Sequence, residues 1–188
     1  MEKEQLLDDT IFVIRNFLTP QECARFIERT EAAGYEDAPI TTGAGFVMRK
    51  DVRDNGRVML DDAGLAARLW ERARPMLPAE WSSWRLSGFN ERFRFYRYDV
   101  GQCFAPHLDG YFEREDGERS LFTFMVYLND DFTGGTTNFY HCRPPLGVVP
   151  ERGMALVFVH KQLHEGAPVE NGRKYVLRTD VMYRPMRD

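Results

Sequence analysis

The chain has 188 residues, of which 43% are hydrophobic and 29% are charged, with a formal net charge of −4. We expect a single domain over residues 1–188, because this length can bury roughly 70% of the unfolded surface in one core. A pI of about 5.6 is not typical of a general nucleic-acid-binding protein. No stretch approaches the roughly 18 apolar residues of a membrane span, and the charged start Met1–Gln5 does not lead into the apolar segment of a signal peptide. We therefore expect neither nucleic acid nor a membrane as partner.

The three cysteines are odd in number and show no Cys-x-x-Cys spacing. This pattern indicates neither a disulfide framework nor a zinc ribbon. We interpret Cys23, Cys103 and Cys142 as reduced thiols of a cytoplasmic protein. The oligomeric state is left open by the sequence.

The N-terminal part of the chain predicts one strand and two helices. Residues 11–14 are β-branched and aromatic, as in a short strand. Residues 19–22, Thr-Pro-Gln-Glu, combine an N-cap, a proline at the first helical position and a capping-box glutamate, so a helix of about 14 residues should follow and end at Gly34. A second helix should begin at the Asp61-Asp62 cap and end near Pro75 or Pro78.

A basic stretch separates these two helices. Residues 38–57 hold turn sequences at 41–45 and 54–56, with Arg49, Lys50, Arg53 and Arg57 among them. One interpretation is a mobile loop that reaches an anionic or polar substrate, since binding residues favour loops. The other is a solvated hairpin whose charges face water. We keep Arg49 and Arg57 as candidate substrate-binding residues.

From Trp84 onward the chain reads as strands and turns. Residues 92–98 alternate with period two, so Phe93 and Phe95 share one face, which should pack under the helices. The other face is polar yet aromatic and suits the lining of a cavity; it carries Arg92, Arg94, Tyr96 and Tyr98.

Further strands are expected at 121–128, 136–140, 155–159 and 175–182, with a turn at Gly134-Gly135. Two helices followed by seven or eight strands predict a mainly β fold, with helices packed on an antiparallel sandwich or barrel. We divide it into an N-terminal helical support, about 1–83, and a β core, about 84–188.

Three side chains form a candidate metal site. His107 and Asp109 are two residues apart, so on an extended strand they leave the same face. His164 follows far along the chain and supplies a third ligand. Two histidines with one carboxylate leave open coordination positions, as in non-haem Fe(II) oxygenases, whereas the cysteines are poorly placed for a zinc cage. We interpret the remaining histidines, His141 and His160, as structural.

An Fe(II) oxygenase needs a reductant, and 2-oxoglutarate would require a cation for its far carboxylate. Lys174 follows His164 by ten residues, at the start of the last strand, and could supply this charge. Considered alone, Lys174 is better explained as a surface lysine, and only its combination with the triad favours an anion-binding role. Arg178, on the same strand face, is a second candidate for binding the anion.

The ordered motifs resemble the prolyl 4-hydroxylase superfamily of 2-oxoglutarate/Fe(II)-dependent dioxygenases. They are His107-x-Asp109, residues 127–135 (Tyr-Leu-Asn-Asp-Asp-Phe-Thr-Gly-Gly), His164-Glu165-Gly166 and Lys174-Tyr175. Val149-Pro150 and Gly153, followed by Leu156-Val157-Phe158, look like that family's strand before the distal histidine. The resemblance covers residues from about 90 to 185. One departure is Thr136-Thr137, where Glu-Thr is more usual after the double glycine.

The resemblance implies a double-stranded β-helix of the jelly-roll or cupin-like kind, with two facing antiparallel sheets. It implies Fe(II), 2-oxoglutarate and O2 as cofactors, with ascorbate as reductant. His107, Asp109 and His164 would be the iron ligands and the catalytic residues. Lys174 would bind the C5 carboxylate of 2-oxoglutarate, and Tyr98 and Tyr127 would line and support that pocket.

The implied activity is hydroxylation of a C–H bond, with succinate and CO2 as co-products. The substrate would be a peptidyl, proline-like residue or a small amino-acid-like metabolite. Its candidate contacts are Arg92, Arg94 and Tyr96, together with Arg49 and Arg57. The N-terminal third matches the family only loosely, so the substrate is not named. The alternative is a non-enzymatic cupin-like protein for metal or ligand binding or sensing, which need not place Lys174, Tyr98 and Tyr127 around the triad.

Overall fold

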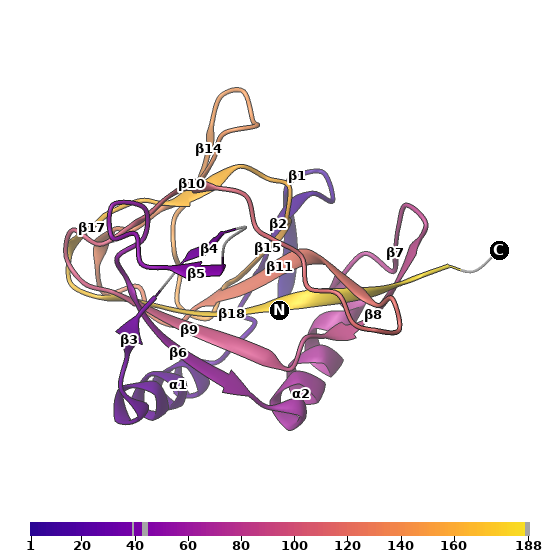
Figure 1. Cartoon of the computed structure of the whole chain (residues 1–188), viewed down its shortest axis with the longest axis horizontal. Helices are drawn as coiled ribbons and strands as arrows, with labels where there is room; N and C mark the ends of the chain where they lie inside the picture. Colours follow the sequence, from indigo (N-terminus) through magenta and orange to yellow (C-terminus); the bar gives the residue numbers. More distant parts are fainter. Residues whose placement is uncertain (39, 43–44, 187–188) are drawn as a thin grey trace.

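The computed structural model describes residues 1–38, 40–42 and 45–186. Two antiparallel sheets face each other, and two α-helices cover the outer face of the larger sheet (Figure 1). This is the predicted mainly β architecture with helices packed on a sandwich. Neither α-helix in the described part of the chain is long and apolar enough to cross a membrane.

Both predicted helices are confirmed, and their caps explain where they begin. Helix α1 (Pro20–Ala33) starts after Thr19, whose hydroxyl accepts a hydrogen bond from the Glu22 amide while the Glu22 carboxylate accepts one from the Thr19 amide. Helix α2 (Ala63–Ala73) starts after Asp62, whose carboxylate accepts from the Leu65 amide at 2.8 Å. A short 3₁₀ turn, Arg74–Met76, ends α2 at the predicted proline.

The larger sheet joins both ends of the chain. Its strand order is β1 (Glu2–Leu7), β2 (Ile11–Arg15), β15 (Ala155–Val159), β11 (Arg119–Tyr127), β18 (Lys174–Pro185), β9 (Arg92–Tyr98), β6 (Gly56–Asp61) and β3 (Glu36–Asp37). In addition β8 (Trp84–Phe89) pairs with β18, and β7 (Glu80–Trp81) pairs with β8. Strands β1, β3 and β6 were not predicted from the sequence, and they extend the sheet at its two edges.

The smaller sheet includes the two strands that carry His107 and His164. Its order is β10 (Phe104–His107), β16 (His164–Gly166), β13 (Thr137–Phe139) and β14 (Leu146–Val148). Two further pairs are β12 (Thr133–Gly134) with β17 (Val169–Asn171), and β4 (Ile40–Thr42) with β5 (Gly45–Val47). The β4–β5 pair gives part of the basic stretch a hairpin backbone. Gly43 and Ala44 of the predicted turn lie outside the described residues.

The two faces of β9 differ as the alternation predicts. Phe93 and Phe95 are fully buried in the core under α1 and α2, where the Phe95 ring lies 5.6 Å from that of Phe26. Burying such a side chain stabilises the fold by roughly 1.5–3 kcal/mol. Tyr96 and Tyr98 belong instead to the second cluster, between the two sheets. The space between the sheets is therefore where polar groups of the large sheet meet the strands that carry the histidines.

Candidate active site

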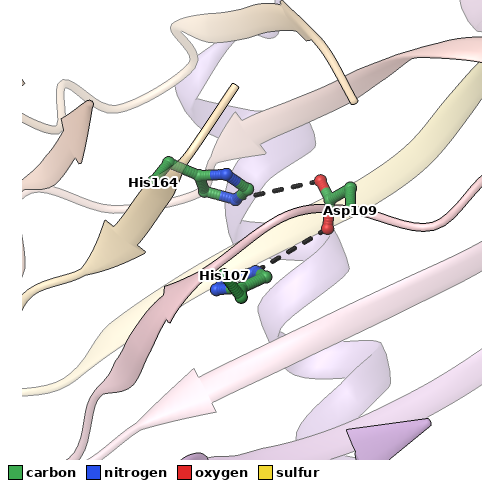
Figure 2. A group of neighbouring side chains, drawn as sticks. All are labelled: His107, Asp109 and His164. Carbon is green, nitrogen blue, oxygen red and sulfur yellow. Dashed lines mark ion pairs between the residues drawn. The ribbon is translucent and has the colours of Figure 1, made fainter. Parts of the chain in front are cut away.

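The three predicted metal ligands come together at one end of the smaller sheet. His107 ends β10 and His164 begins β16, and these antiparallel neighbours pair residue to residue at the two histidines. Asp109 lies two residues after His107. Its backbone amide donates a hydrogen bond to the carbonyl of His160 at 3.1 Å, which fixes its position. The Asp109 carboxylate lies 3.7 Å from Nε2 of His107 and 3.8 Å from Nε2 of His164. Figure 2 shows the three side chains converging, with ligand atoms that lie within 4.8 Å of one another.

Both imidazoles are prepared to bind a cation. Nδ1 of His107 lies 2.8 Å from the carbonyl of Ala105, and Nδ1 of His164 lies 2.9 Å from the carbonyl of Gln162. Since a carbonyl only accepts, each Nδ1 carries the hydrogen and each Nε2 presents a lone pair towards Asp109. Burial, with the neighbouring His164, lowers the pKa of His107 to about 4, and burial also lowers the pKa of His164. Neutral imidazoles beside a carboxylate fit a divalent iron.

The carboxylate of Asp109 is kept ionised and fixed in place. Burial alone would raise its pKa, but the Arg178 guanidinium, 3.0 Å away, and His164 outweigh burial and hold the pKa well below its usual range. The hydroxyl of Thr123 donates to the second carboxylate oxygen at 2.5 Å. Asp109 is thus oriented by two neighbours before any metal binds.

A second layer supports Thr123. Nδ1 of His160 lies 3.0 Å from the Thr123 hydroxyl, and its Nε2 lies 3.0 Å from the hydroxyl of Ser120. His160 is thus hydrogen-bonded, as a structural histidine should be, but it is buried and lies directly behind Asp109, a candidate metal ligand. His141 accepts a hydrogen bond from the Leu163 amide at 3.3 Å and does not reach the site.

An inner cavity extends from the triad to Lys174 between the two sheets. Lys174 is 3% exposed, and its Nζ donates to the carbonyl of Gly135 at 2.5 Å. Among the described residues no carboxylate pairs with it, and burial lowers its pKa to about 7. A buried ammonium without a counter-ion is costly. The inner cavity therefore presents an uncompensated cation to any ligand that enters it.

The double glycine allows this arrangement. Gly134 and Gly135 both have positive φ, at 74° and 64°. A Cβ on Gly134 would lie 2.5 Å from the carbonyl oxygen of Pro168, and one on Gly135 would lie 3.1 Å from Cδ of Lys174. Glycine is required here both for the backbone conformation and for the close approach.

The two tyrosines predicted to line and support the co-substrate pocket differ in their distance from the inner cavity. Both ring centroids are 5.4 Å from Nζ of Lys174. Tyr98 lines the inner cavity. The hydroxyl of Tyr127 instead pairs with that of Thr137 at 2.7 Å, and it is Thr137 that lines the cavity. Tyr127 thus supports the lining from behind, while Arg178 lies at the opposite end, beside Asp109.

A second, wider space opens on the other side of the triad, and we call it the outer cleft. Its volume is about 540 Å³, against about 40 Å³ for the inner cavity. It shares part of its lining with the inner cavity: Tyr96, Phe104, His107, Asp109 and Arg178. Its own lining is Val52, Arg53, Arg57, Arg94, Leu108, Gly110 and Tyr111.

The candidate substrate contacts divide into two groups. Arg57, Arg94 and Tyr96 line the outer cleft. Arg92 is exposed and pairs with Asp61 at 2.9 Å, and Arg49 is exposed and pairs with Asp51 at 2.6 Å; neither lines the inner cavity or the outer cleft. Sequence reasoning missed the place of Arg53, Phe104 and Thr123 in these linings. For Thr123 a signal existed, because it alternates with Met125 and Tyr127 on one face of a predicted strand.

The fold and the triad together define a jelly-roll protein with a two-histidine, one-carboxylate metal site. A model of the 2OG-Fe(II) oxygenase superfamily matches residues 93–179. This match covers just under half of the chain and includes His107, Asp109, His164 and Lys174, so the region that holds the triad is similar to 2OG-Fe(II) oxygenases.

Relatives of known name lie among plant prolyl 4-hydroxylases. Prolyl 4-hydroxylase 1 of Arabidopsis thaliana is 25% identical over 197 residues, which cover 88% of this chain and 66% of that protein. Probable prolyl 4-hydroxylase 8 of the same plant is 26% identical, with 87% and 65% covered. The chain thus spans just under two thirds of the length of these relatives.

Solved structures share the fold at lower identity. A viral collagen prolyl hydroxylase from Paramecium Bursaria Chlorella virus-1, in its 2OG complex, has a TM-score of 0.66 at 20% identity, covering 92% of this chain and 96% of its own. A Trichoplax adhaerens prolyl hydroxylase in complex with a hypoxia inducible factor peptide fragment has a TM-score of 0.71 at 16% identity, covering 93% and 84%.

Proposed function

We propose that this protein is an Fe(II)- and 2-oxoglutarate-dependent dioxygenase that hydroxylates a C–H bond and releases succinate and CO2. The observation that carries the proposal is the placement, in one cavity, of the His107–Asp109–His164 cluster and the uncompensated ammonium of Lys174. The substrate is a peptidyl, proline-like residue or a small amino-acid-like metabolite. The names of the relatives support the first, and the outer cleft, whose volume of about 540 Å³ is that of a small-molecule site, suits the second.

Each residue has a role that its contacts allow. His107, Asp109 and His164 would hold Fe(II), which when bound supplies the site for O2 activation alongside 2-oxoglutarate. Lys174 would pair with the far carboxylate of the co-substrate. The far carboxylate would join the Gly135 carbonyl as an acceptor for the Lys174 ammonium.

Aromatic packing covers part of each imidazole. The Phe104 ring stacks on His107 with centroids 3.5 Å apart, and the Phe158 ring meets His164 edge-on at 4.5 Å. Such packing fixes ring orientation and lowers the local dielectric, which strengthens the electrostatic interactions of the site. We also propose ascorbate as auxiliary reductant and the cytoplasm as location, as the sequence leads us to expect.

Succinate release tests the proposal. The purified protein with Fe(II) and ascorbate should bind 2-oxoglutarate and convert it to succinate, and peptidyl-proline and amino-acid panels should stimulate that conversion. Asp109→Asn should lose the conversion. Binding of 2-oxoglutarate without succinate formation under every panel member would instead favour the non-enzymatic cupin-like alternative, in which the cavity only senses its ligand.

A further inference from the structure

The outer cleft carries an excess of positive charge. Four guanidinium groups line it, those of Arg53, Arg57, Arg94 and Arg178. The carboxylates that pair with them are Asp109, 3.0 Å from Arg178, and Asp180, 3.2 Å from Arg94 and 3.5 Å from Arg178. Two carboxylates against four guanidinium groups leave an excess of two positive charges, in a chain whose net charge is −4. A concave site with one sign of charge focuses the field on an incoming ion.

Arg57 is the least compensated member of this group. It is half-buried on β6, opposite Tyr96 of β9, and its guanidinium makes no ion pair or hydrogen bond with any described residue. Burial lowers its pKa, and although Tyr96 and Glu36 oppose this effect, the nearby Arg53 and Arg94 add to it, so the pKa stays lowered. Like charges held together in a partly desolvated place cost free energy unless an anion joins them.

Arg53 is fixed and still has an unused donor. It is 6% exposed, and its guanidinium lies between the rings of Tyr96 and Phe104, 4.4 and 4.5 Å from their centroids. Its Nε donates to the side-chain oxygen of Asn55 at 2.7 Å, while one Nη has no hydrogen-bond partner among the described residues. A stacked guanidinium with free donors is preorganised to bind a planar anion.

The hydroxyl of Tyr96 completes the group. It is buried beside the guanidinium groups of Arg53 and Arg178, which can only donate to its oxygen, so its own hydrogen meets no acceptor in the described part of the chain. Burial alone would raise the pKa of Tyr96, but the guanidinium groups of Arg53, Arg178 and Arg94 outweigh it and the pKa is lowered. Buried polar groups are normally paired, so unpaired donors of Tyr96 and Arg53 in one place point to a missing acceptor.

We propose that the outer cleft binds a carboxylate of the substrate through Arg57, Arg53 and Tyr96, so that the substrate is a small carboxylic acid. This inference rests on the proposed function, because the cleft shares His107 and Asp109 with the inner cavity and an anion at Arg57 would place the rest of the molecule beside the metal ligands. The volume of the cleft lies within the range of small-molecule sites, about 300–1,000 Å³. The N-terminal basic stretch thereby sets substrate selectivity.

A binding experiment tests this without turnover. The protein is loaded with Mn(II) and 2-oxoglutarate, and its melting temperature is followed with free amino acids, each matched with its own carboxamide, and with blocked prolyl peptides that carry no carboxylate. At least one free acid should raise the melting temperature while its carboxamide does not. Arg57→Gln should weaken binding of that acid about 10- to 100-fold, and Arg57→Lys, which keeps the charge without the planar fork, should weaken it less. The matched control is Arg92→Gln, which removes an exposed arginine of the neighbouring strand outside the cleft and should leave the affinity unchanged.

Three results would overturn the inference: equal binding of acids and carboxamides, tight binding of the neutral peptides that Arg57→Gln leaves unaltered, or no binding of any acid at millimolar concentration. The melting shift caused by 2-oxoglutarate in the same samples separates the two proposals. If wild type shows no such shift, the proposed function fails; if the shift is present and acids are not preferred, only the carboxylate site fails. Retention of the shift in Arg57→Gln shows that this variant is folded.

Discussion

The two faces of the large sheet have opposite energetics. On β9, Phe93 and Phe95 pack under the helices and are fully buried among apolar side chains. Their neighbours Tyr96 and Tyr98 face a cavity in which ammonium, guanidinium, imidazole and carboxylate groups are withdrawn from water. The first face releases free energy on folding, whereas the second costs free energy until its ligands bind.

The same division runs along β18. Leu177 and Val181 belong to the helix-covered core, while Lys174 and Arg178 face the cavity. Because alternate residues of a strand serve opposite faces, one strand both stabilises the fold and carries the site. Substitutions on the two faces should therefore separate stability from function.

The largest effect is expected on the apolar face. Phe95→Ala should reduce the free energy of unfolding by about 3–5 kcal/mol, because it opens a cavity beside α1. Urea titration measures this loss. The affinity for 2-oxoglutarate in the folded fraction should stay within about twofold, and a large loss of affinity would break the proposed separation.

On the polar face the strongest effect should come from the metal carboxylate. Asp109→Asn keeps an oxygen for Thr123 and a polar neighbour for Arg178, but it removes the negative charge. Since changes behind the ligands already cost about 10- to 100-fold in metal affinity, we expect a loss of more than 100-fold, measured by Mn(II) titration and by succinate formation. Thr123→Val, which only removes the hydrogen bond to Asp109, should cost about tenfold. Equal losses in the two variants would contradict the assignment of Asp109 as ligand.

Lys174→Met should change stability and function in opposite directions. The affinity for 2-oxoglutarate should fall about 10- to 100-fold, the usual loss for a hydrogen bond to a charged group. In the absence of co-substrate at pH 7, the free energy of unfolding should rise by about 1–2 kcal/mol, because a buried unpaired charge is replaced by an apolar side chain. Calorimetric binding and urea unfolding provide the two measurements. A variant that is both less stable and unchanged in affinity would make Lys174 a structural residue.

A smaller effect should appear in the pH dependence of stability. The pKa of Lys174 falls from its ordinary value of 10.5 to about 7 on folding. Between these values the unfolded chain holds a proton that the folded chain has released, so the free energy of unfolding rises with pH across this window. The slope is at most about 1.4 kcal/mol per pH unit. From pH 7 to pH 10 without co-substrate, the free energy of unfolding of wild type should rise relative to that of Lys174→Met, and parallel profiles would show that folding does not lower the pKa of Lys174.

The parts of the fold and site that could be predicted from the sequence are those set by interactions between residues close together in the chain. The caps at Thr19 and Asp62, the alternation of residues 92–98 and the spacing of His107 and Asp109 each act over a few residues, so they can be read directly from the chain. Which strands lie side by side depends on long-range pairing, which alternation does not encode. Arg57 reaches the cleft only because β6 pairs with β9.

The misplaced residues have similar causes. Arg92 shares the polar face of β9, but it lies at the strand end, beyond the cavity, where Asp61 is its partner across the pair. Arg53 looked like one more charge of a basic stretch, and only the rings of Tyr96 and Phe104 make it a buried residue. Strand β1, Glu-Lys-Glu-Gln-Leu-Leu, has no alternation, and it forms because β2 offers it a partner.

The position of β2 in the sheet bears on how the chain folds. Ile14 pairs with Ala155, so a strand from the first residues of the chain is completed by one from near its end. During synthesis β2 can pair with β1 on one edge, but its other edge has no partner until residues 155–159 have left the ribosome. Pairings of such sequence separation slow folding, into the range of about milliseconds to seconds for β proteins. We expect refolding to be limited by this closure, with α1 formed long before the strand that precedes it is docked.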